Sequence, residues 1–241
     1  MCFAGEHRPG ERERMHMSDY YRERLSAERL ERAYAIAPPR VRRYLDAEID
    51  HVLERIGPAD FVLELGCGCG RVLKPLARRA RMACGIDTSF ESLLCARGAL
   101  EGRTNCRFAQ MDAVRLGFRD GAFDCTVCIQ NGISAFHVDM RELARESIRV
   151  TRPGGLVLFS SYSDSFWEHR LEWFERQAAE GLIGEIDRER TKNGTIVCTD
   201  GFTASTVSER QFESLARDLG AAARIVEVDS SSVFCEITVG T

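Results

Sequence analysis

The chain has 241 residues, enough for one domain with a substantial hydrophobic core and modest additions. A formal net charge of -4, with arginines interleaved among glutamates, argues against a nucleic-acid partner bound by phosphate neutralisation. No apolar run approaches the roughly 20 residues of a membrane-spanning helix, and residues 1–8 lack the apolar core of a secretory signal. We therefore expect a cytoplasmic protein without nucleic-acid or membrane partners.

Two helices are predicted before the first strand. Residues 1–17 are polar, charged and interrupted by glycine and proline, so we expect them to be disordered. Ser18 is a suitable N-cap for a first helix, and Pro38-Pro39 interrupt the chain and place a proline in the favoured first turn of a second helix. Apolar residues at helical spacing then continue to Ile56, just before Gly57.

A short apolar run then leads into a glycine-rich turn. Residues 62–65 have the composition of a buried parallel strand, and residues 66–70 alternate glycine with cysteine before a helix that begins at about Arg71. A dinucleotide-binding loop would have its third glycine at position 71, which is occupied by arginine. Glu64, two residues before the first glycine, would repel a pyrophosphate. It would suit a ligand that has an ammonium group.

Four further strands are predicted in the following hundred or so residues. Residues 81–87 end in Asp87, about twenty positions past the first glycine, where a carboxylate accepts from ribose hydroxyls. Residues 105–112 and 123–129 form the third and fourth strands. An Arg-Pro-Gly-Gly turn opens the fifth strand within 152–159.

In this order the motifs resemble those of the class I S-adenosylmethionine-dependent methyltransferases, whose first motif has the form acidic-x-Gly-x-Gly-x-Gly. The resemblance covers about residues 61–161. It implies an α/β, Rossmann-like fold: a doubly wound, mostly parallel sheet of seven strands with the last strand antiparallel, preceded by lid helices. It further implies a single methyltransferase domain over 18–241, with lid helices in 18–57, a cofactor-binding core in 61–161 and a substrate-side insertion in 162–206.

The resemblance implies S-adenosyl-L-methionine as the cofactor, which has an ammonium and a sulfonium group but no phosphate. Glu64 would face the methionyl ammonium, the glycines would allow close approach, Asp87 would hold the ribose and Asp112 would accept from the adenine amine. The expected cofactor-binding residues are Glu64, Gly66, Cys67, Gly68, Gly70, Asp87, Thr88, Met111, Asp112, Ala113, Gln130, Asn131 and Tyr21.

The segment after the fourth strand should contact both cofactor and substrate, because ligands bind beyond the carboxyl ends of parallel strands. Asn131 and His137 lie in this segment, and Tyr162 and Trp167 follow the fifth strand; we expect all four to bind substrate. His137 is the candidate catalytic base, with a polar residue ahead of a helix start as the alternative interpretation. Methyl transfer is an in-line displacement that the protein mainly orients and desolvates, so a side-chain catalyst is not obligatory.

Ten cysteines are present, and we expect most of them to be small buried side chains. Without a secretory signal a disulfide framework is not expected. Cys125 and Cys128 have the spacing of half a zinc site, but residues three apart on a strand point to opposite faces and cannot share a metal. No metal site is predicted. The alternative is metalloid chemistry, since some members of the family methylate arsenite held by cysteine thiolates.

Further helices and strands are predicted in the last part of the chain. A helix is expected over 164–180, with one or two short strands around an Asp-Gly turn within 192–203. A capping box at Ser208-x-x-Gln211 opens a further helix that ends at Gly220, and two strands follow over 222–228 and 233–239.

These observations predict an enzyme that transfers a methyl group from S-adenosylmethionine to a small-molecule acceptor, as a monomer or homodimer. A metalloid methyltransferase of the arsenite type is one alternative. A non-catalytic S-adenosylmethionine-binding partner or regulatory protein is another. The dehydrogenase hypothesis fails on Glu64 and Arg71.

Overall fold

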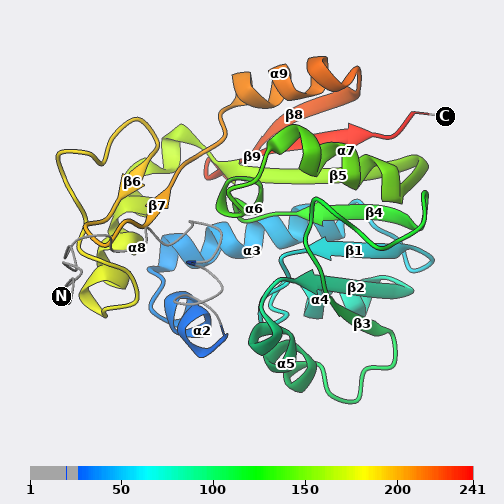
Figure 1. The fold of residues 1–241 in the computed structure, drawn as a ribbon, viewed down its shortest axis with the longest axis horizontal. Helices are drawn as coiled ribbons and strands as arrows, with labels where there is room; N and C mark the ends of the chain where they lie inside the picture. The colour runs from blue at the N-terminus through cyan, green and yellow to red at the C-terminus, as the bar shows by residue number, and fades with distance from the viewer. Residues whose placement is uncertain (1–19, 21–26, 241) are drawn as a thin grey trace, which may run out of the picture.

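The computed structural model describes residue 20 and residues 27–240 (Figure 1). The predicted extension over 1–17, the N-cap Ser18 and Tyr21 lie outside the described residues. Within the part of the chain that the structure describes, no helix combines the length and apolar character needed to cross a membrane.

Seven strands of the described residues form one mixed sheet (Figure 1). They are β1 (Phe61–Leu65), β2 (Met82–Asp87), β3 (Cys106–Gln110), β4 (Phe123–Cys128), β5 (Thr151–Tyr162), β8 (Ala222–Val228) and β9 (Ser232–Thr238). Their order in the sheet is β3-β2-β1-β4-β5-β9-β8. The first five pair in parallel, and β9 runs antiparallel to both β5 and β8. The predicted seven-stranded sheet with an antiparallel last strand is therefore confirmed.

Helices lie on both faces of this sheet. They are α2 (Ala27–Ala35), α3 (Pro39–Leu53), α4 (Leu73–Arg79), α5 (Phe90–Ala99), α6 (Gly132–Ala135), α7 (Met140–Val150), α8 (Trp167–Ala179) and α9 (Glu209–Leu219). Val62 of β1 packs in one core cluster with side chains of α3 and α4, whereas its neighbour Leu63 packs in another with side chains of α7 and α9. Cys125 and Cys128 divide between these two clusters in the same way, which confirms that their thiols point to opposite faces. The fold is doubly wound, as predicted.

The local signals for helix ends are confirmed at α3 and α9. Pro39 occupies the first turn of α3. Both hydrogen bonds of the capping box join Ser208 and Gln211, and Gly220 ends α9 in the left-handed conformation, with a φ of 61°. Each signal was readable from sequence because it depends on residues only a few positions apart.

The predicted helix over 164–180 begins as a short 3-10 turn, η1 (Asp164–Phe166), which continues into α8. The buried face of α8 includes Trp173 and Phe174. Trp173 is only 5% exposed, while Leu171 is only partly buried. Its indole Nε1 donates to the carbonyl oxygen of Ala33 in α2 at 2.8 Å, so a helix distant in sequence decides which face is covered.

A third hydrophobic cluster lies beyond the carboxyl ends of the parallel strands, where Figure 1 shows α8 near the start of α3. Besides α8 it includes Tyr44 of α3, Tyr162 at the end of β5 and the hairpin of β6 (Ile196–Val197) and β7 (Thr203–Ala204). This cluster joins the helices before the sheet to the segment that follows β5. It forms one wall of the cavity described below.

Glu236 of β9 fixes α3 against the sheet. Its carboxylate, almost fully buried, accepts hydrogen bonds from Arg55 Nε at 2.7 Å and Arg224 Nη2 at 2.8 Å, and lies 2.8 Å from His51 Nε2. Burial by itself raises the pKa of this carboxyl, but the hydrogen bonds from Arg224 and His51 and the charges of both arginines outweigh it and lower the pKa below its usual value. This carboxylate is buried and paired, which marks a structural role.

Glu236→Gln should therefore destabilise the protein at neutral pH by about 1 to 3 kcal/mol, because Arg55 and His51 lose their charged acceptor. The native pKa lies below the ordinary 4.5, so the stabilisation is present above that pH and disappears as the pH falls through the folded-state value. Urea unfolding of both proteins over a pH series measures the difference. A gap that stays constant through the acid range would contradict this role.

Candidate active site

A cavity of about 930 Å³ lies at the carboxyl ends of the parallel strands, between the glycine-rich loop 66–70, α2 and α8. Its size is within the usual range of small-molecule sites. The predicted cofactor-binding residues that line it are Glu64, Gly66, Cys67, Gly68, Gly70, Asp87, Thr88, Met111, Asp112, Ala113, Gln130 and Asn131. Tyr21 lies outside the described residues.

The glycine loop has a backbone conformation that residues other than glycine rarely adopt. The φ angles of Gly66, Gly68 and Gly70 are 71°, 50° and 82°. Space is limited as well. A Cβ at Gly66 would lie 2.6 Å from the ring of Phe136, and one at Gly68 would lie 3.0 Å from the Leu30 side chain of α2. The glycines thus let α2 and the segment after β4 pack directly on the loop, in addition to any ligand.

Glu64 and Arg71 place opposite charges at the loop. Glu64 is 4% exposed, and its Oε2 has no hydrogen-bond partner among the described residues. Burial raises its pKa well above the usual range; the Arg71 charge opposes this shift and the Asp87 charge adds to it. Arg71 lies with its guanidinium 4.5 Å from the centre of the Tyr34 ring, and its Nε and Nη2 are likewise buried without a partner in the described part of the chain.

This pair can bind a zwitterion, with the carboxylate facing an ammonium and the guanidinium facing a carboxylate. The sequence analysis used Arg71 only to exclude a dinucleotide and assigned it no ligand. The available signal was a cation directly after the third glycine, which the start of α4 holds beside the loop.

Asp87 joins the loop to the end of β2. Its Oδ2 accepts from the Gly68 N–H at 2.9 Å and its Oδ1 from the Ser89 N–H at 2.8 Å. Burial raises its pKa, although these hydrogen bonds act in the opposite direction. Each carboxylate oxygen keeps capacity for a second hydrogen bond from a ligand hydroxyl. Asp112, by contrast, is exposed at the cavity rim, where its Oδ1 accepts from the Val114 N–H at 3.1 Å.

The turn after β4 is strained, because Gln130 and Asn131 both have positive φ, 58° and 63°. The Asn131 side chain holds this turn: its Oδ1 accepts from Ser161 Oγ at 2.7 Å and its Nδ2 donates to the Ser205 carbonyl at 3.0 Å. Its amide is therefore used to join β4, β5 and the segment after β7. The predicted contact of Asn131 with substrate stays a prediction.

His137 lines the cavity with a φ of 53°, and its Nε2 is buried with no hydrogen-bond partner among the residues described. Burial lowers its pKa below the usual value, so the imidazole is neutral at neutral pH and able to accept a proton. Tyr162 also lines the cavity, whereas Trp167 is not one of its lining residues and lies half-buried beside Arg170.

Other aromatic side chains that the sequence analysis did not assign to substrate line the same end of the cavity. They come from the helices before the sheet and from the segment after β5, and they are Tyr34, Trp173, Phe174 and Phe202. Aromatic residues of this kind also form ordinary cores, so the sequence offers no signal that separates a cavity wall from a core.

Comparison with known proteins finds a methyltransferase domain in the core of the chain. A family model described as a methyltransferase domain matches residues 62–155, which include the glycine loop, Asp87 and Asp112. The chain is 28% identical over 148 residues to 2-methyl-6-phytyl-1,4-hydroquinone methyltransferase of Synechocystis, covering 54% of this chain and 46% of that protein. It is 38% identical over 109 residues to demethylmenaquinone methyltransferase of Mycobacterium marinum, covering 45% and 44%. These matches support a class I S-adenosylmethionine-dependent methyltransferase.

A solved structure extends the likeness of this methyltransferase domain beyond the matched core. It is the N-methyltransferase NodS from Bradyrhizobium japonicum in complex with S-adenosyl-l-homocysteine. The TM-score is 0.58 at 17% identity, over 93% of this chain and 99% of that chain, which shows a shared fold. The matched segments span about half the length of the two curated relatives.

Beneath the cavity of this methyltransferase domain, the lid helix α3 contributes a buried carboxyl that the sequence analysis missed. Glu48 Oε2 accepts from the Gln130 N–H at 2.6 Å, and its Oε1 has no partner in the described residues. Burial raises its pKa to about 7, even though hydrogen bonds from Ser160 and Gln130 favour the charged form. Glu48 thus supports the strained turn at an electrostatic cost.

Glu48→Gln should stabilise the protein above neutral pH. Because the pKa is about 7 in the folded state against an ordinary 4.5, the folded protein keeps a proton that the unfolded chain loses, and wild-type stability falls as the pH rises through this window. The glutamine variant should gain on the order of 3 kcal/mol over wild type at about pH 8 and almost nothing at about pH 4. Urea unfolding at a series of pH values tests this.

The matched control is Asp46→Asn, which removes an exposed carboxylate from the same helix and should leave the pH dependence unchanged. If Glu48→Gln and wild type show parallel stability curves, the carboxyl is already charged in the folded protein.

Proposed function

We propose that this protein binds S-adenosylmethionine in the cavity and transfers its methyl group to a small-molecule acceptor. The observation that carries the proposal is a set of buried atoms at the glycine loop that have no hydrogen-bond partner among the described residues, Glu64 Oε2 and Arg71 Nε and Nη2. Such groups cost free energy unless a ligand satisfies them. The methionyl part of S-adenosylmethionine is a zwitterion, with the ammonium and the carboxylate that these two side chains would hold.

The other cavity residues fit the remaining parts of this cofactor. Asp87 keeps acceptor capacity for ribose hydroxyls, and Met111, Asp112 and Ala113 form the adjoining wall. When bound, S-adenosylmethionine supplies a methyl group activated by the sulfonium. The chain would contribute orientation, exclusion of water and an acceptor for the released proton.

The end of the cavity that would hold the methyl acceptor suits a small molecule with an apolar or aromatic body. Tyr34, Tyr162, Trp173 and Phe174 line it, and Gln177 adds an amide that can hydrogen-bond a polar substituent. The relatives named above are hydroquinone and menaquinone-type methyltransferases, and NodS is an N-methyltransferase. We assign His137 as the base that accepts a proton from the acceptor atom, through its unpartnered Nε2.

Metalloid methylation is a second candidate, because the structure brings the thiols of Cys69 and Cys95 together at the loop. The third donor of that group is the Glu31 carboxylate, however, and not a third thiol. The rest of the cavity has an aromatic wall, which suits an organic acceptor better than a metalloid. The organic acceptor is therefore favoured. A non-catalytic binding protein would keep cofactor affinity but show no transfer.

Calorimetric titration with S-adenosylmethionine tests the cofactor site. Glu64→Gln and Arg71→Met should each weaken binding about tenfold to a hundredfold, since each loses one charge-assisted hydrogen bond. Because the Glu64 pKa is raised in the free protein, binding of the ammonium should also release a proton to buffer, detectable as a dependence of the heat on buffer ionisation enthalpy. Glu64→Gln should abolish that release.

Two controls make this result specific. Lys74→Met removes an exposed cation from the same cavity wall and should change affinity little. 5′-Methylthioadenosine lacks the amino-acid group and should bind wild type, Glu64→Gln and Arg71→Met equally. The assignment is wrong if the wild type fails to bind S-adenosylmethionine. It is also wrong if both variants lose binding of 5′-methylthioadenosine as well.

Kinetics of His137→Gln test the base. With an acceptor found by screening phenols, amines and thiols for S-adenosylhomocysteine formation, turnover should fall on the order of a hundredfold while cofactor affinity is retained. Because burial lowers the His137 pKa, the wild-type rate should stay constant as the pH falls to the ordinary 6.5 and drop only below it. His169→Gln, on the exposed side of α8, is the control. An unchanged rate in His137→Gln would show that positioning alone suffices.

A further inference from the structure

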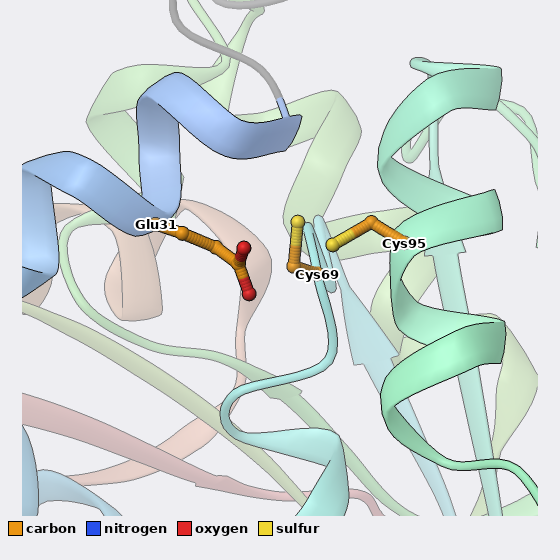
Figure 2. Close-up of side chains that lie close together, drawn as sticks. All are labelled: Glu31, Cys69 and Cys95. Carbon is orange, nitrogen blue, oxygen red and sulfur yellow. The ribbon is translucent and has the colours of Figure 1, made fainter.

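Three potential metal ligands meet at the edge of the cavity, beside the glycine loop. Glu31 comes from α2, Cys69 from the glycine loop and Cys95 from α5, and one donor atom of each lies within 4.8 Å of the other two. Figure 2 shows the Glu31 carboxylate extending from α2 toward the loop, with the Cys95 sulfur directed at Cys69. We propose that Glu31, Cys69 and Cys95 form a binding site for one thiophilic divalent cation of the zinc type.

The donor set selects the class of metal. Two thiolates and one carboxylate are ligands of Zn²⁺ and of softer ions such as Cd²⁺, whereas Mg²⁺ and Ca²⁺ require oxygen ligands. In a tetrahedral site with metal–sulfur bonds of about 2.3 Å, neighbouring sulfurs lie about 3.8 Å apart. The three donor atoms lie within 4.8 Å of one another, so binding would draw them together by at most roughly an ångström.

The surroundings favour a cation. Cys69 is nearly fully buried, and the carboxylates of Glu31 and Asp87 are the negative charges near it. A positive charge beside these groups is electrostatically favourable. A divalent cation supplies that charge; binding replaces two S–H bonds with two metal–sulfur bonds and releases two protons to solvent.

The site joins three elements that are separate in sequence. Cys69 lies between two glycines of the loop, and Leu30, next to Glu31, contacts the loop where a Gly68 Cβ would project. Ser89, which caps α5, accepts from the Ser92 N–H, and Ser92 Oγ in turn accepts from the Ala27 N–H of α2 at 3.3 Å. A bound metal would therefore hold α2 closed over the loop, a structural role that does not require the proposed methyl transfer.

Titration of the reduced, chelator-treated full-length protein with Cd²⁺ tests the site through thiolate-to-metal charge-transfer absorption. We expect saturation at one Cd²⁺ per chain, displacement by Zn²⁺ and a higher thermal midpoint for the loaded protein. Cys69→Ser and Cys95→Ser should each abolish stoichiometric binding, and Glu31→Gln should weaken it about tenfold or more. Cys198→Ser, which removes a buried thiol of the segment after β5, is the matched control and should bind as wild type does.

Circular dichroism and thermal unfolding of the metal-free variants separate loss of the site from loss of the fold. The proposal is overturned by an absence of saturable binding, by binding that survives both serine variants, or by a Cys69–Cys95 disulfide that persists in reducing buffer. Because the readout is metal binding, these outcomes do not depend on whether the protein turns out to be a methyltransferase in solution.

Discussion

Burial of charge without an internal partner is the constraint on which the site depends. Two carboxyls at the carboxyl ends of the strands, Glu48 and Glu64, are buried, and each has an oxygen with no hydrogen-bond partner among the described residues. In both, burial raises the pKa. Glu236, on the same sheet, is equally buried but lies among two arginines and a histidine, and its pKa is lowered. The fold thus has the means to neutralise a buried carboxylate, and it does so only away from the cavity.

That contrast separates structural from ligand-directed groups. A protein with free-energy margins of about 5 to 15 kcal/mol tolerates few unsatisfied buried charges, so those that persist require another explanation. For Glu64 and Arg71 we propose that a zwitterionic ligand is the explanation. Glu48 accepts from the N–H of Gln130, in the turn where Gln130 and Asn131 have positive φ angles.

Part of the cavity wall comes from two segments that are far apart in the chain, one before β1 and one after β5. The helices before β1 and the segment after β5 share one hydrophobic cluster, and the Trp173 indole donates to the Ala33 carbonyl within it. Closure of the cavity is therefore coupled to packing of α8. The group of Glu31, Cys69 and Cys95 lies at the opposite edge, where α2 meets the loop and α5 (Figure 2). Within the described residues, α2 thus contacts α8 through Ala33 and α5 through Ala27.

The sheet, the glycine loop and a set of cavity-lining residues could be predicted from the sequence, because they depend on short motifs: a strand with a terminal carboxylate, closely spaced glycines, a capping box at Ser208. The sequence also separated Cys125 from Cys128, since strand periodicity is local. Only the tertiary structure shows that side-chain atoms of Arg71 and Glu48 are buried without a partner in the described residues, that the Asn131 amide bonds to Ser161 and Ser205, and that Cys69 lies beside Cys95. Each of these features depends on contacts between residues that are distant in the chain. Such contacts decide which atoms are buried, and residue spacing gives no signal of them.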